Sequence, residues 1–364
     1  MLTKYKTLGR SGLRVSPLCL GTMTFGQQWG WGSSAEESKD ILDRYLELGG
    51  NFIDTANIYT KGYSEHFIGE YFANKTGSAS NHPRDRVVIA TKFMGNMYIG
   101  DPNGGGAGRK AIIGACEESL RRLRTDYIDL YWAHFWDQFT PLDEMVRAMD
   151  DLVRTGKVRY IGLSDHPAWV VAHCHHLLKE INGAPLIALQ IEYSLAQRTV
   201  EGELMPMAQH FGLGVTPWSP LRAGLLSGKI NRKTWPTEAT RMQKNSPHLT
   251  EKNYQIIDEL AAVSEEVAAS PAQVAIRWLM QKAGVTSPII GARTLAQLED
   301  NVQAATISLT EQQMARLDSV SSVTHAFPYD FVQAVKANIL GGTEVNGETR
   351  PAWDLAPASD AERF

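Results

Sequence analysis

The stretch NFIDTANIYTKGYSE (51–65) is the most informative about the fold, because a strand-like run in it is followed at once by side chains that can take part in proton transfer. Its beginning, NFIDTA (51–56), is short and mostly apolar, as expected of a β-strand. Asp54 lies near the end of this run, and Tyr59 follows just beyond it. The stretch therefore predicts a strand whose carboxyl end carries polar residues suited to chemistry.

Two later runs end in the same way. VVIATKF (87–93) carries Lys92 and IDLYWAHF (128–135) carries His134, each near its C-terminal end. Alone, the Asp would be interpreted as a cap, the Lys as a surface cation and the His as a core residue. In a (β/α)₈ barrel, however, the strand C-termini converge on one mouth, and catalytic residues come from several strands. The sequence thus predicts a single catalytic group made of Asp54, Tyr59, Lys92 and His134.

These side chains suit the reduction of an aldehyde or ketone, which needs a hydride on carbon and a proton on oxygen. An unperturbed tyrosine has a pKa of about 10, and a neighbouring ammonium lowers it. We expect Lys92 to play this part, with Asp54 holding it charged and Tyr59 acting as the acid. His134 is expected to be neutral and to orient the substrate oxygen.

Short β-rich runs alternate with amphipathic segments along the chain. Eight runs have the character of barrel strands: PLCLGT (17–22), NFIDTA (51–56), VVIATK (87–92), IDLYWAH (128–134), RYIGLS (159–164), IALQIEY (187–193), GVTPWS (214–219) and TSPIIGA (286–292). Helical patterns occupy residues 36–50, 109–123, 141–157 and 270–284. Eight such units indicate an α/β fold, a closed (β/α)₈ TIM barrel rather than an open doubly wound sheet.

The two ends of the chain depart from this alternation. KYKTLGRSGLRVS (4–16) contains a turn signal and predicts a β-hairpin that plugs the barrel floor. Residues 319–364 lose the alternation, and we expect the first part of this extension to pack over the barrel mouth. The whole chain, 1–364, is predicted to be one domain with its barrel core at about residues 5–318.

Composition limits the partners. The 364 residues are 43% hydrophobic with a formal net charge of −4, which argues against a nucleic-acid or anionic-membrane surface. No run approaches the roughly 18 apolar residues that span a bilayer, and the N-terminus lacks the apolar core of a signal peptide. Three scattered cysteines are expected to be free thiols in a reducing compartment, so the expected location is cytoplasmic. The oligomeric state is left open, with a homo-oligomer as one outcome.

Ordered motifs resemble the aldo-keto reductase superfamily, near its bacterial members and the potassium-channel β-subunits. They are NFIDTANIYTKGYSE, VVIATK, LRRLRTDYIDLYWAHFWD, GKVRYIGLSD, QIEYSLAQR, TPWSPLRAGLLSGK and IIGARTLAQLEDNV. The resemblance runs from about Tyr5 to Leu317. It implies a (β/α)₈ barrel, and it implies that the four residues named above are the family's catalytic tetrad.

The resemblance also implies a cofactor, NADPH or less often NADH, bound without a Rossmann domain. The chain indeed lacks a GxGxxG motif opening a βα unit. The residues implied to bind the cofactor are Gly21, Thr22, Met23, Asp54, Ser164, Asp165, Gln190, Trp218, Ser219, Pro220, Leu221, Gly224, Lys229, Gly291, Arg293, Gln297, Asp300 and Asn301. Trp218 offers a flat apolar face for the nicotinamide ring, and Arg293 offers a planar fork for a ribose 2′-phosphate.

One position departs from the family pattern, which usually has Asn where GLSD has Asp165. A carboxylate accepts hydrogen bonds and donates none, and its charge would favour the oxidised, positively charged nicotinamide. The alternative is that Asp165 turns toward His166 or solvent.

Large apolar side chains that follow strand ends are candidate walls of the substrate pocket: Phe25, Trp29, Trp31, Met94 and Trp136. Ordinary loop packing is the alternative for each. The cluster HCHH (173–176) is interpreted as part of a helix, because no HExxH or CxxC motif accompanies it, and no metal site is predicted.

The predicted function is the NADPH-dependent, reversible reduction of a small-molecule aldehyde or ketone to an alcohol. There are two alternatives. One is a dehydrogenase acting mainly in the alcohol-oxidising direction. The other is a cofactor-binding regulatory subunit with little turnover, as channel β-subunits are within this family.

Overall fold

The computed structural model describes residues 1–75, 82–236 and 242–363. Its central feature is a parallel sheet of eight strands in the order β10-β3-β4-β5-β6-β7-β8-β9. The strands are β3 (Cys19–Gly21), β4 (Phe52–Asp54), β5 (Val88–Phe93), β6 (Ile128–Ala133), β7 (Val158–Ser164), β8 (Leu186–Glu192), β9 (Gly214–Trp218) and β10 (Ile289–Gly291). Near the closing edge, Thr286 N donates to Val215 O at 2.8 Å. The predicted (β/α)₈ barrel is confirmed, and all eight predicted strands are present.

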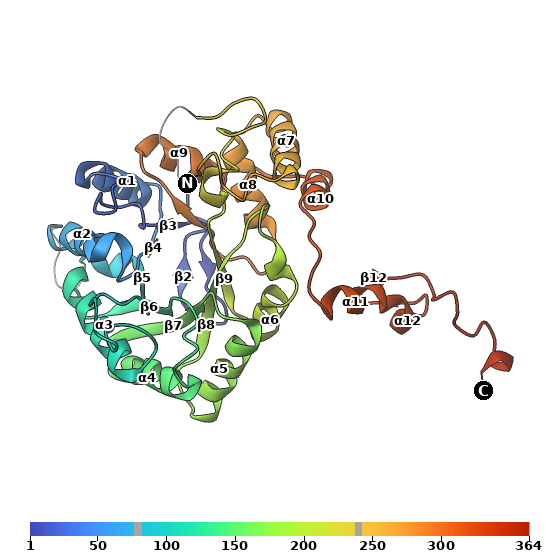
Figure 1. Ribbon diagram of the computed structural model, residues 1–364, viewed down its shortest axis with the longest axis horizontal. Coiled ribbons are helices and arrows are strands. Elements are labelled where there is room, and N and C mark those ends of the chain that lie inside the picture. The colour runs from blue at the N-terminus through green and yellow to red at the C-terminus, as the bar shows by residue number, and fades with distance from the viewer. Residues whose placement is uncertain (76–81, 237–241, 364) are drawn as a thin grey trace.

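Helices surround the sheet on its outer side (Figure 1). They are α1 (Ala35–Glu47), α2 (Tyr63–Ala73), α3 (Arg109–Leu123), α4 (Leu142–Arg154), α5 (Ala168–Glu180), α6 (Leu204–Phe211), α7 (Glu251–Glu266), α8 (Pro271–Gln281), α9 (Leu295–Gln303) and α10 (Glu311–Val320). Two of these helices begin at a capping box, which Ser34 and Ser270 each form with the residue three positions on. In the described residues, no helix is long and apolar enough to cross a membrane.

Short 3₁₀ helices complete the connections: η1 (Tyr59–Gly62), η2 (Pro83–Arg86), η3 (Thr199–Glu201), η4 (Arg222–Gly224) and η5 (Asp360–Glu362).

The hairpin predicted at the N-terminus is present as β1 (Lys6–Thr7) paired antiparallel with β2 (Arg14–Val15). Leu8 and Val15 belong to the apolar cluster inside the barrel, together with strand residues such as Trp132. Its turn fits closely, because a Cβ built on Gly9 would lie 2.2 Å from Ile187 O. Gly9 also has a positive φ of 58°, so a larger residue would be strained there. The hairpin therefore closes the barrel end opposite the carboxyl ends of the strands.

The C-terminal extension differs from the expectation. It contains α11 (Tyr329–Ala334), α12 (Lys336–Leu340) and a small hairpin of β11 (Glu344–Val345) and β12 (Glu348–Thr349). Figure 1 shows this part of the chain leaving the barrel beside α10 and projecting away from it, and no residue from 323 to 363 lines the mouth cavity. The prediction that the first part of this extension packs over the barrel mouth is wrong, because the segment leaves the barrel beside α10 and none of its described residues lines the cavity. Phe364 lies outside the described residues.

Two glycines in neighbouring helices should respond oppositely to a methyl group. A Cβ on Gly69 in α2 would lie 2.2 Å from Arg122 O, so Gly69→Ala forces α2 away from the end of α3. Overpacking of this kind costs about 1–3 kcal/mol of unfolding free energy. A Cβ on the exposed Gly114 in α3 meets nothing within 4 Å, so Gly114→Ala should stabilise by about 0.5–1 kcal/mol. Urea unfolding of both variants checks the pair, and equal effects would contradict this packing.

Candidate active site

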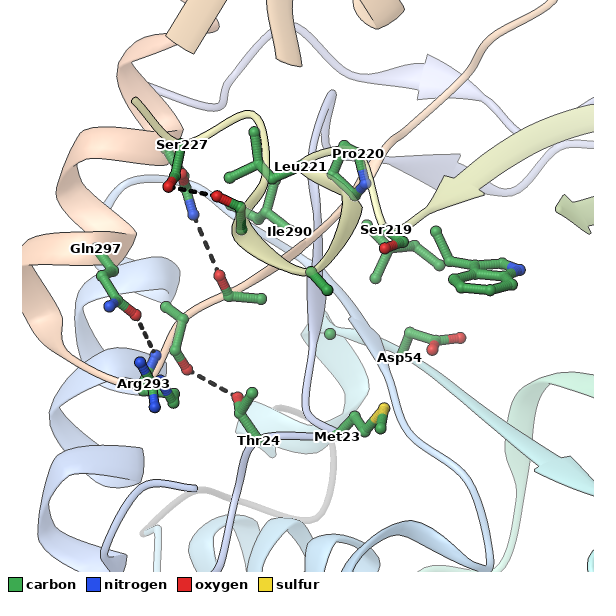
Figure 2. Close-up of a pocket in the computed structure, with 18 of the residues that line it drawn as sticks. Met23, Thr24, Asp54, Ser219, Pro220, Leu221, Ser227, Ile290, Arg293 and Gln297 are labelled. Atoms are coloured by element: carbon green, nitrogen blue, oxygen red, sulfur yellow. Dashed lines mark hydrogen bonds between the residues drawn. The ribbon is translucent and has the colours of Figure 1, made fainter. Parts of the chain in front are cut away.

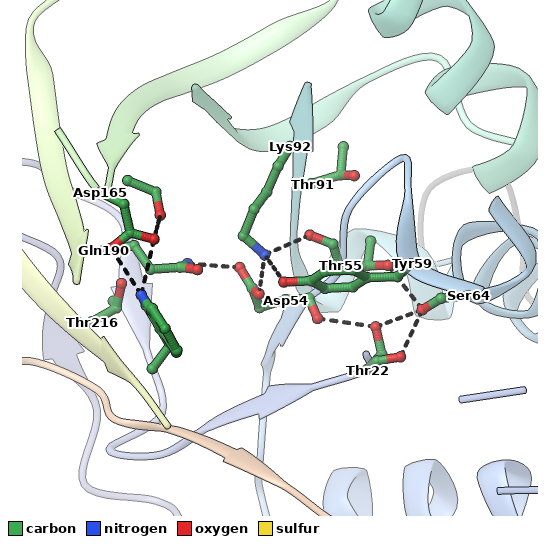
Figure 3. A network of polar contacts seen from close by, with 12 residues as sticks. Thr22, Asp54, Thr55, Tyr59, Ser64, Thr91, Lys92, Asp165, Gln190 and Thr216 are labelled. Atoms are coloured by element: carbon green, nitrogen blue, oxygen red, sulfur yellow. Dashed lines mark hydrogen bonds and ion pairs between the residues drawn. The ribbon is translucent and has the colours of Figure 1, made fainter. Parts of the chain in front are cut away.

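Lys92 is the centre of a polar network inside the barrel (Figure 3). It is fully buried, and an ammonium has three donors and no acceptor. All three find a partner: Asp54 Oδ2 at 2.5 Å, Thr55 O at 2.8 Å and Tyr59 Oη at 3.0 Å. Burial by itself lowers the pKa of Lys92, but Asp54 and Tyr59 outweigh it and hold that pKa above its usual value. Lys92 is therefore charged at neutral pH.

The register of the sheet brings Asp54 to Lys92. Asp54 ends β4 and pairs with Ala90 on β5, two residues before Lys92, so Ala90 and Lys92 face the same side of the sheet. The other carboxylate oxygen, Asp54 Oδ1, accepts from Gln190 Nε2 on β8 at 2.9 Å. Because β4 and β8 lie on different sides of the barrel, this carboxylate links strands that do not pair.

A tight turn after β4 places Tyr59. Thr60 and Lys61 within η1 have positive φ angles of 46° and 60°. The Thr60 hydroxyl donates to Phe25 O at 2.9 Å and accepts from Ser64 N at 3.1 Å, which fixes the turn. The phenol of Tyr59 consequently points back at Lys92.

Burial raises the pKa of Tyr59, and Lys92 opposes this rise without cancelling it. The sequence-based expectation is that Lys92 lowers the pKa of Tyr59. Lys92 does lower it, but the rise caused by burial is larger, so the net pKa of Tyr59 is raised. At neutral pH the phenol is protonated, which is the form that a proton donor requires.

His134 follows β6, and its ring stands edge-on to Tyr59 with centroids 5.8 Å apart. Burial, with Lys92 adding to it, lowers the pKa of His134 to about 2, so the imidazole is neutral. Its Nδ1 atom is buried and has no hydrogen-bond partner within the described ranges. A neutral imidazole carries one N–H donor and one acceptor, so its state agrees with the sequence-based expectation.

A cavity of about 590 Å³ borders this network and extends from the ends of β3 and β4 to the start of α9. That volume suits a cofactor-sized ligand. The predicted site residues that line it are Gly21, Met23, Trp29, Asp54, Tyr59, His134, Asp165, Gln190, Trp218, Ser219, Pro220, Leu221, Gly224, Lys229, Gly291, Arg293, Gln297, Asp300 and Asn301.

Asp165 and Trp218 meet at the end of the cavity that Asp54, Tyr59 and Gln190 line. The Trp218 indole N–H is 3.0 Å from Asp165 Oδ1 and 3.1 Å from Oδ2. Asp165 has a positive φ of 50°, a conformation that Asp adopts more readily than most residues. His166 uses its Nδ1 on Ser164 O instead, at 2.6 Å. The carboxylate thus faces Trp218 and the cavity rather than His166, and burial raises its pKa to about 6.

The opposite end is shaped by a curled segment and a helix start (Figure 2). Ser219, Ala223 and Gly224 all have positive φ, and the Ser227 hydroxyl donates to Gly224 O at 2.6 Å. A Cβ built on Gly224 would meet nothing within 4 Å, so the cavity is open at this segment.

The start of α9 is held by its own side chains. Arg293 N donates to Gln297 Oε1 at 2.9 Å, and Asn301 Nδ2 donates to Gly291 O at 3.1 Å. Asp300 accepts from Gln273 Nε2 at 2.6 Å, on the neighbouring α8. A helix N-terminus beside an arginine favours an anionic group, and Lys229 adds a second cation to the lining.

Some predicted residues lie behind the cavity wall. Lys92, Thr22 and Ser164 are buried and support the lining, with Thr22 Oγ1 donating to Asp54 O at 3.0 Å. Phe25 and Met94 are buried in the core, so the structure does not bring them to the cavity where the substrate pocket is expected. Trp31 packs against Trp29, and Trp136 packs edge-on against Trp169, so neither lines the cavity.

The cavity also has walls that the sequence interpretation omitted: Thr24, Ile58, Phe135, Ala223, Ser227, Ile230, Pro236, Ala272, Ile289, Ile290 and Ala292. Most of these stand inside or next to the quoted motifs, so their neighbours in sequence could have indicated them. In the described residues, no group of three or more His, Cys, Asp or Glu side chains could hold a metal ion.

Comparison with known proteins shows which protein family this chain resembles. The model of the Aldo/keto reductase family matches residues 17–322. An uncharacterized oxidoreductase, YrpG of Bacillus subtilis, is 38% identical over 326 residues, which cover 87% of this chain and 95% of that protein. Norsolorinic acid reductase stcV of Emericella nidulans is 36% identical over 330 residues, covering 88% and 82%. An NADP(+) aryl-alcohol dehydrogenase of Phanerodontia chrysosporium is 34% identical over 341 residues, covering 87% and 86%.

The raised pKa of Asp165 has a consequence for stability. Between the ordinary carboxyl pKa of 3.8 and the folded value of about 6, the folded state binds more protons than the unfolded state. The contribution of Asp165 to stability therefore falls as pH rises through this window. Asp165→Asn should be more stable than wild type at pH 7, and the difference should vanish below the ordinary pKa. Urea unfolding of both proteins at pH 7 and at a pH below 3.8 measures the difference in unfolding free energy.

Asp137→Asn is the matched control of opposite sign. Burial raises the pKa of Asp137, but hydrogen bonds from Ala107 N and Thr140 outweigh it and hold that pKa below its usual value. This variant should lose stability at neutral pH. A destabilised Asp165→Asn at pH 7 would show that its carboxylate is better solvated than this geometry allows.

Proposed function

We propose that this chain, which belongs to the aldo/keto reductase family, reduces aldehydes and ketones with NADPH in a reversible reaction. Aromatic carbonyl compounds are its proposed preferred class of substrate. Membership makes the chain an oxidoreductase. The observation that carries the proposal is the buried Lys92–Asp54–Tyr59 network beside a neutral His134 at one end of a cofactor-sized cavity.

The division of labour follows from protonation states. When bound, the reduced nicotinamide supplies a hydride to the carbonyl carbon. Tyr59, protonated and hydrogen-bonded to Lys92, gives its phenolic proton to the carbonyl oxygen. The ammonium of Lys92 then stabilises the phenolate that remains, at 3.0 Å. His134 is neutral and borders the same space, so it can donate a hydrogen bond to the substrate oxygen and position it.

The cavity lining fits a dinucleotide. Trp218 presents a flat face close to Gln190 and Asp54, where a nicotinamide would stack near the catalytic residues. At the far end, Lys229, Arg293 and the N-terminus of α9 would hold phosphate groups. The arginine fork favours the extra 2′-phosphate of NADPH over NADH.

Aromatic substrates fit the walls beside the tetrad. Trp29, Ile58 and Phe135 border the cavity next to Tyr59 and His134, and each offers apolar or aromatic surface. Two relatives are named for aromatic alcohol oxidation and for norsolorinic acid reduction, which is consistent with this class.

Alcohol oxidation is the second candidate direction. The Asp165 carboxylate faces the cavity and would attract an oxidised, positively charged nicotinamide.

The cytoplasmic location and the interpretation of residues 1–364 as a single domain stay predictions.

Tyr59→Phe should lower kcat by roughly 10²- to 10⁴-fold, because general acid catalysis is lost while the ring keeps its packing. NADPH affinity, measured by fluorescence titration, should change little. Tyr63→Phe is the matched control, since the Tyr63 ring packs on Phe67 and its loss of a hydroxyl should leave turnover intact. Near-normal turnover of Tyr59→Phe would refute its role as the acid.

Arg293→Ala should weaken NADPH binding more than NADH binding. A lost charge-assisted contact to phosphate is worth about 1.5–3 kcal/mol, or roughly ten- to a hundredfold in Kd. Arg232→Ala is the control, because Arg232 pairs with Glu251 and Asp258 outside the cavity. Equal weakening of both cofactors by Arg293→Ala would place the 2′-phosphate elsewhere.

A further inference from the structure

The C-terminal arm, residues 323–363, exposes apolar side chains that its own barrel does not cover. None of its residues is buried. Phe327 is 81% exposed and Ile339 is 77% exposed, and Phe331, Trp353 and Leu355 are exposed as well. Several large apolar side chains exposed within one short segment favour an interaction site in that segment.

The arm nevertheless has internal order. His325 N donates to Asp330 Oδ2 at 2.8 Å at the start of α11, and the Phe327 and Phe331 rings lie 5.9 Å apart. Lys336 pairs with Glu348 at 2.8 Å and so joins α12 to the small hairpin. Short helices and a two-stranded hairpin are marginal on their own. The arm therefore requires a surface to pack on.

That surface is not the barrel from which the arm departs. Arg198 holds the end of α10, with Nη1 2.7 Å from Asp318 O and 2.8 Å from Ser321 Oγ. Ser321 is buried, and every described residue after it is at least partly exposed. Figure 1 shows the arm running outward from this anchor, with the C-terminus far from the barrel.

The barrel in turn leaves an apolar rim uncovered at its mouth. This rim consists of Tyr98 and Ile99 after β5, Phe135 and Phe139 after β6, and Trp169 after β7, all of them exposed. The loops after β5 and β6 and the start of α5 are joined, because Ala107 N donates to Asp137 Oδ2 at 2.9 Å and the Trp136 and Trp169 rings are 5.4 Å apart. Phe135 also lines the cavity, so the apolar rim borders the mouth.

We propose that the C-terminal arm of one copy packs across the apolar rim of a second copy, and that the exchange is reciprocal. Each copy carries both halves of the contact, so two copies that exchange arms about a two-fold axis satisfy both contacts and leave no free arm. An aromatic side chain buries roughly 150–250 Å². If about half of that is newly covered for Phe327, Phe331 and Trp353, two exchanged arms and their rims remove on the order of 1,200 Å², the lower limit for a stable interface.

Sedimentation velocity of the full chain tests the proposal. Wild type should sediment as a dimer, and the arm variant Phe327→Asp/Phe331→Asp should sediment as a monomer. The rim variant Phe139→Asp should do the same, since Phe139 is 96% exposed and lies outside the cavity lining. Asn338→Asp is the matched control, because it adds a charge at an exposed arm position without removing apolar surface, and it should remain a dimer.

A mixing experiment separates exchange between copies from closure within one copy. An arm-variant and a rim-variant subunit together retain one of the two contacts, about half of the interface, so an equimolar mixture should show weaker, concentration-dependent association that neither variant shows alone at the same concentration. A monomeric wild type, a dimer that survives both the arm and the rim substitutions, or a mixture that shows no association even at the highest concentration at which both variants alone are monomeric would each overturn the proposal.

Discussion

A fully buried ammonium imposes the strictest requirement on this structure. The desolvation penalty of an isolated charge in a barrel interior is several kcal/mol, and it is offset only when every donor is satisfied. Lys92 meets that condition with a carboxylate, a backbone carbonyl and a phenol, all contributed by β4 or the turn after it. Displacing Asp54 would leave the charge without its counter-ion, and displacing either of the others would leave one N–H donor unsatisfied, so the strand register, the turn at Tyr59 and the protonation state of the network are coupled.

The same requirement ties the site to barrel closure. Asp54 uses one oxygen on Lys92 and the other on Gln190 of β8, while its backbone carbonyl accepts from Thr22 N at 2.9 Å. One residue thereby connects the ends of β3, β4, β5 and β8. The cavity begins where this network ends, so its proposed catalytic end is held by hydrogen bonds that join several strands.

Positions of the strands and of the tetrad could be predicted because they depend on local pattern and motif order. An apolar run that ends on a polar residue carries the same meaning wherever the strand lies in a barrel. The direction of a side chain after the strand does not have this property. Met94 follows β5 as expected, but its φ of 111° turns it into the core, and Phe25 is covered by Phe67. Backbone angles of this kind are set by tertiary packing and have no signal in a single sequence.

The pKa of Tyr59 and the course of the C-terminal arm could not be predicted for a related reason, because both depend on how much surface the rest of the chain covers. The sequence identifies the charge next to Tyr59, but only the fold shows that burial exceeds it.

Burial dominates the ionisation of Asp165 and raises its pKa, while hydrogen bonds from Trp218 and Ser164 oppose the rise without cancelling it. Its pKa of about 6 lies close to neutrality, so its ionisation responds to whatever occupies the cavity. A positively charged ring beside it would lower that pKa and fix the carboxylate in its charged form, whereas a neutral ring would not. By linkage, binding of the oxidised cofactor and deprotonation of Asp165 favour each other. The preference must therefore grow as pH rises through the pKa of the free site and level off above it.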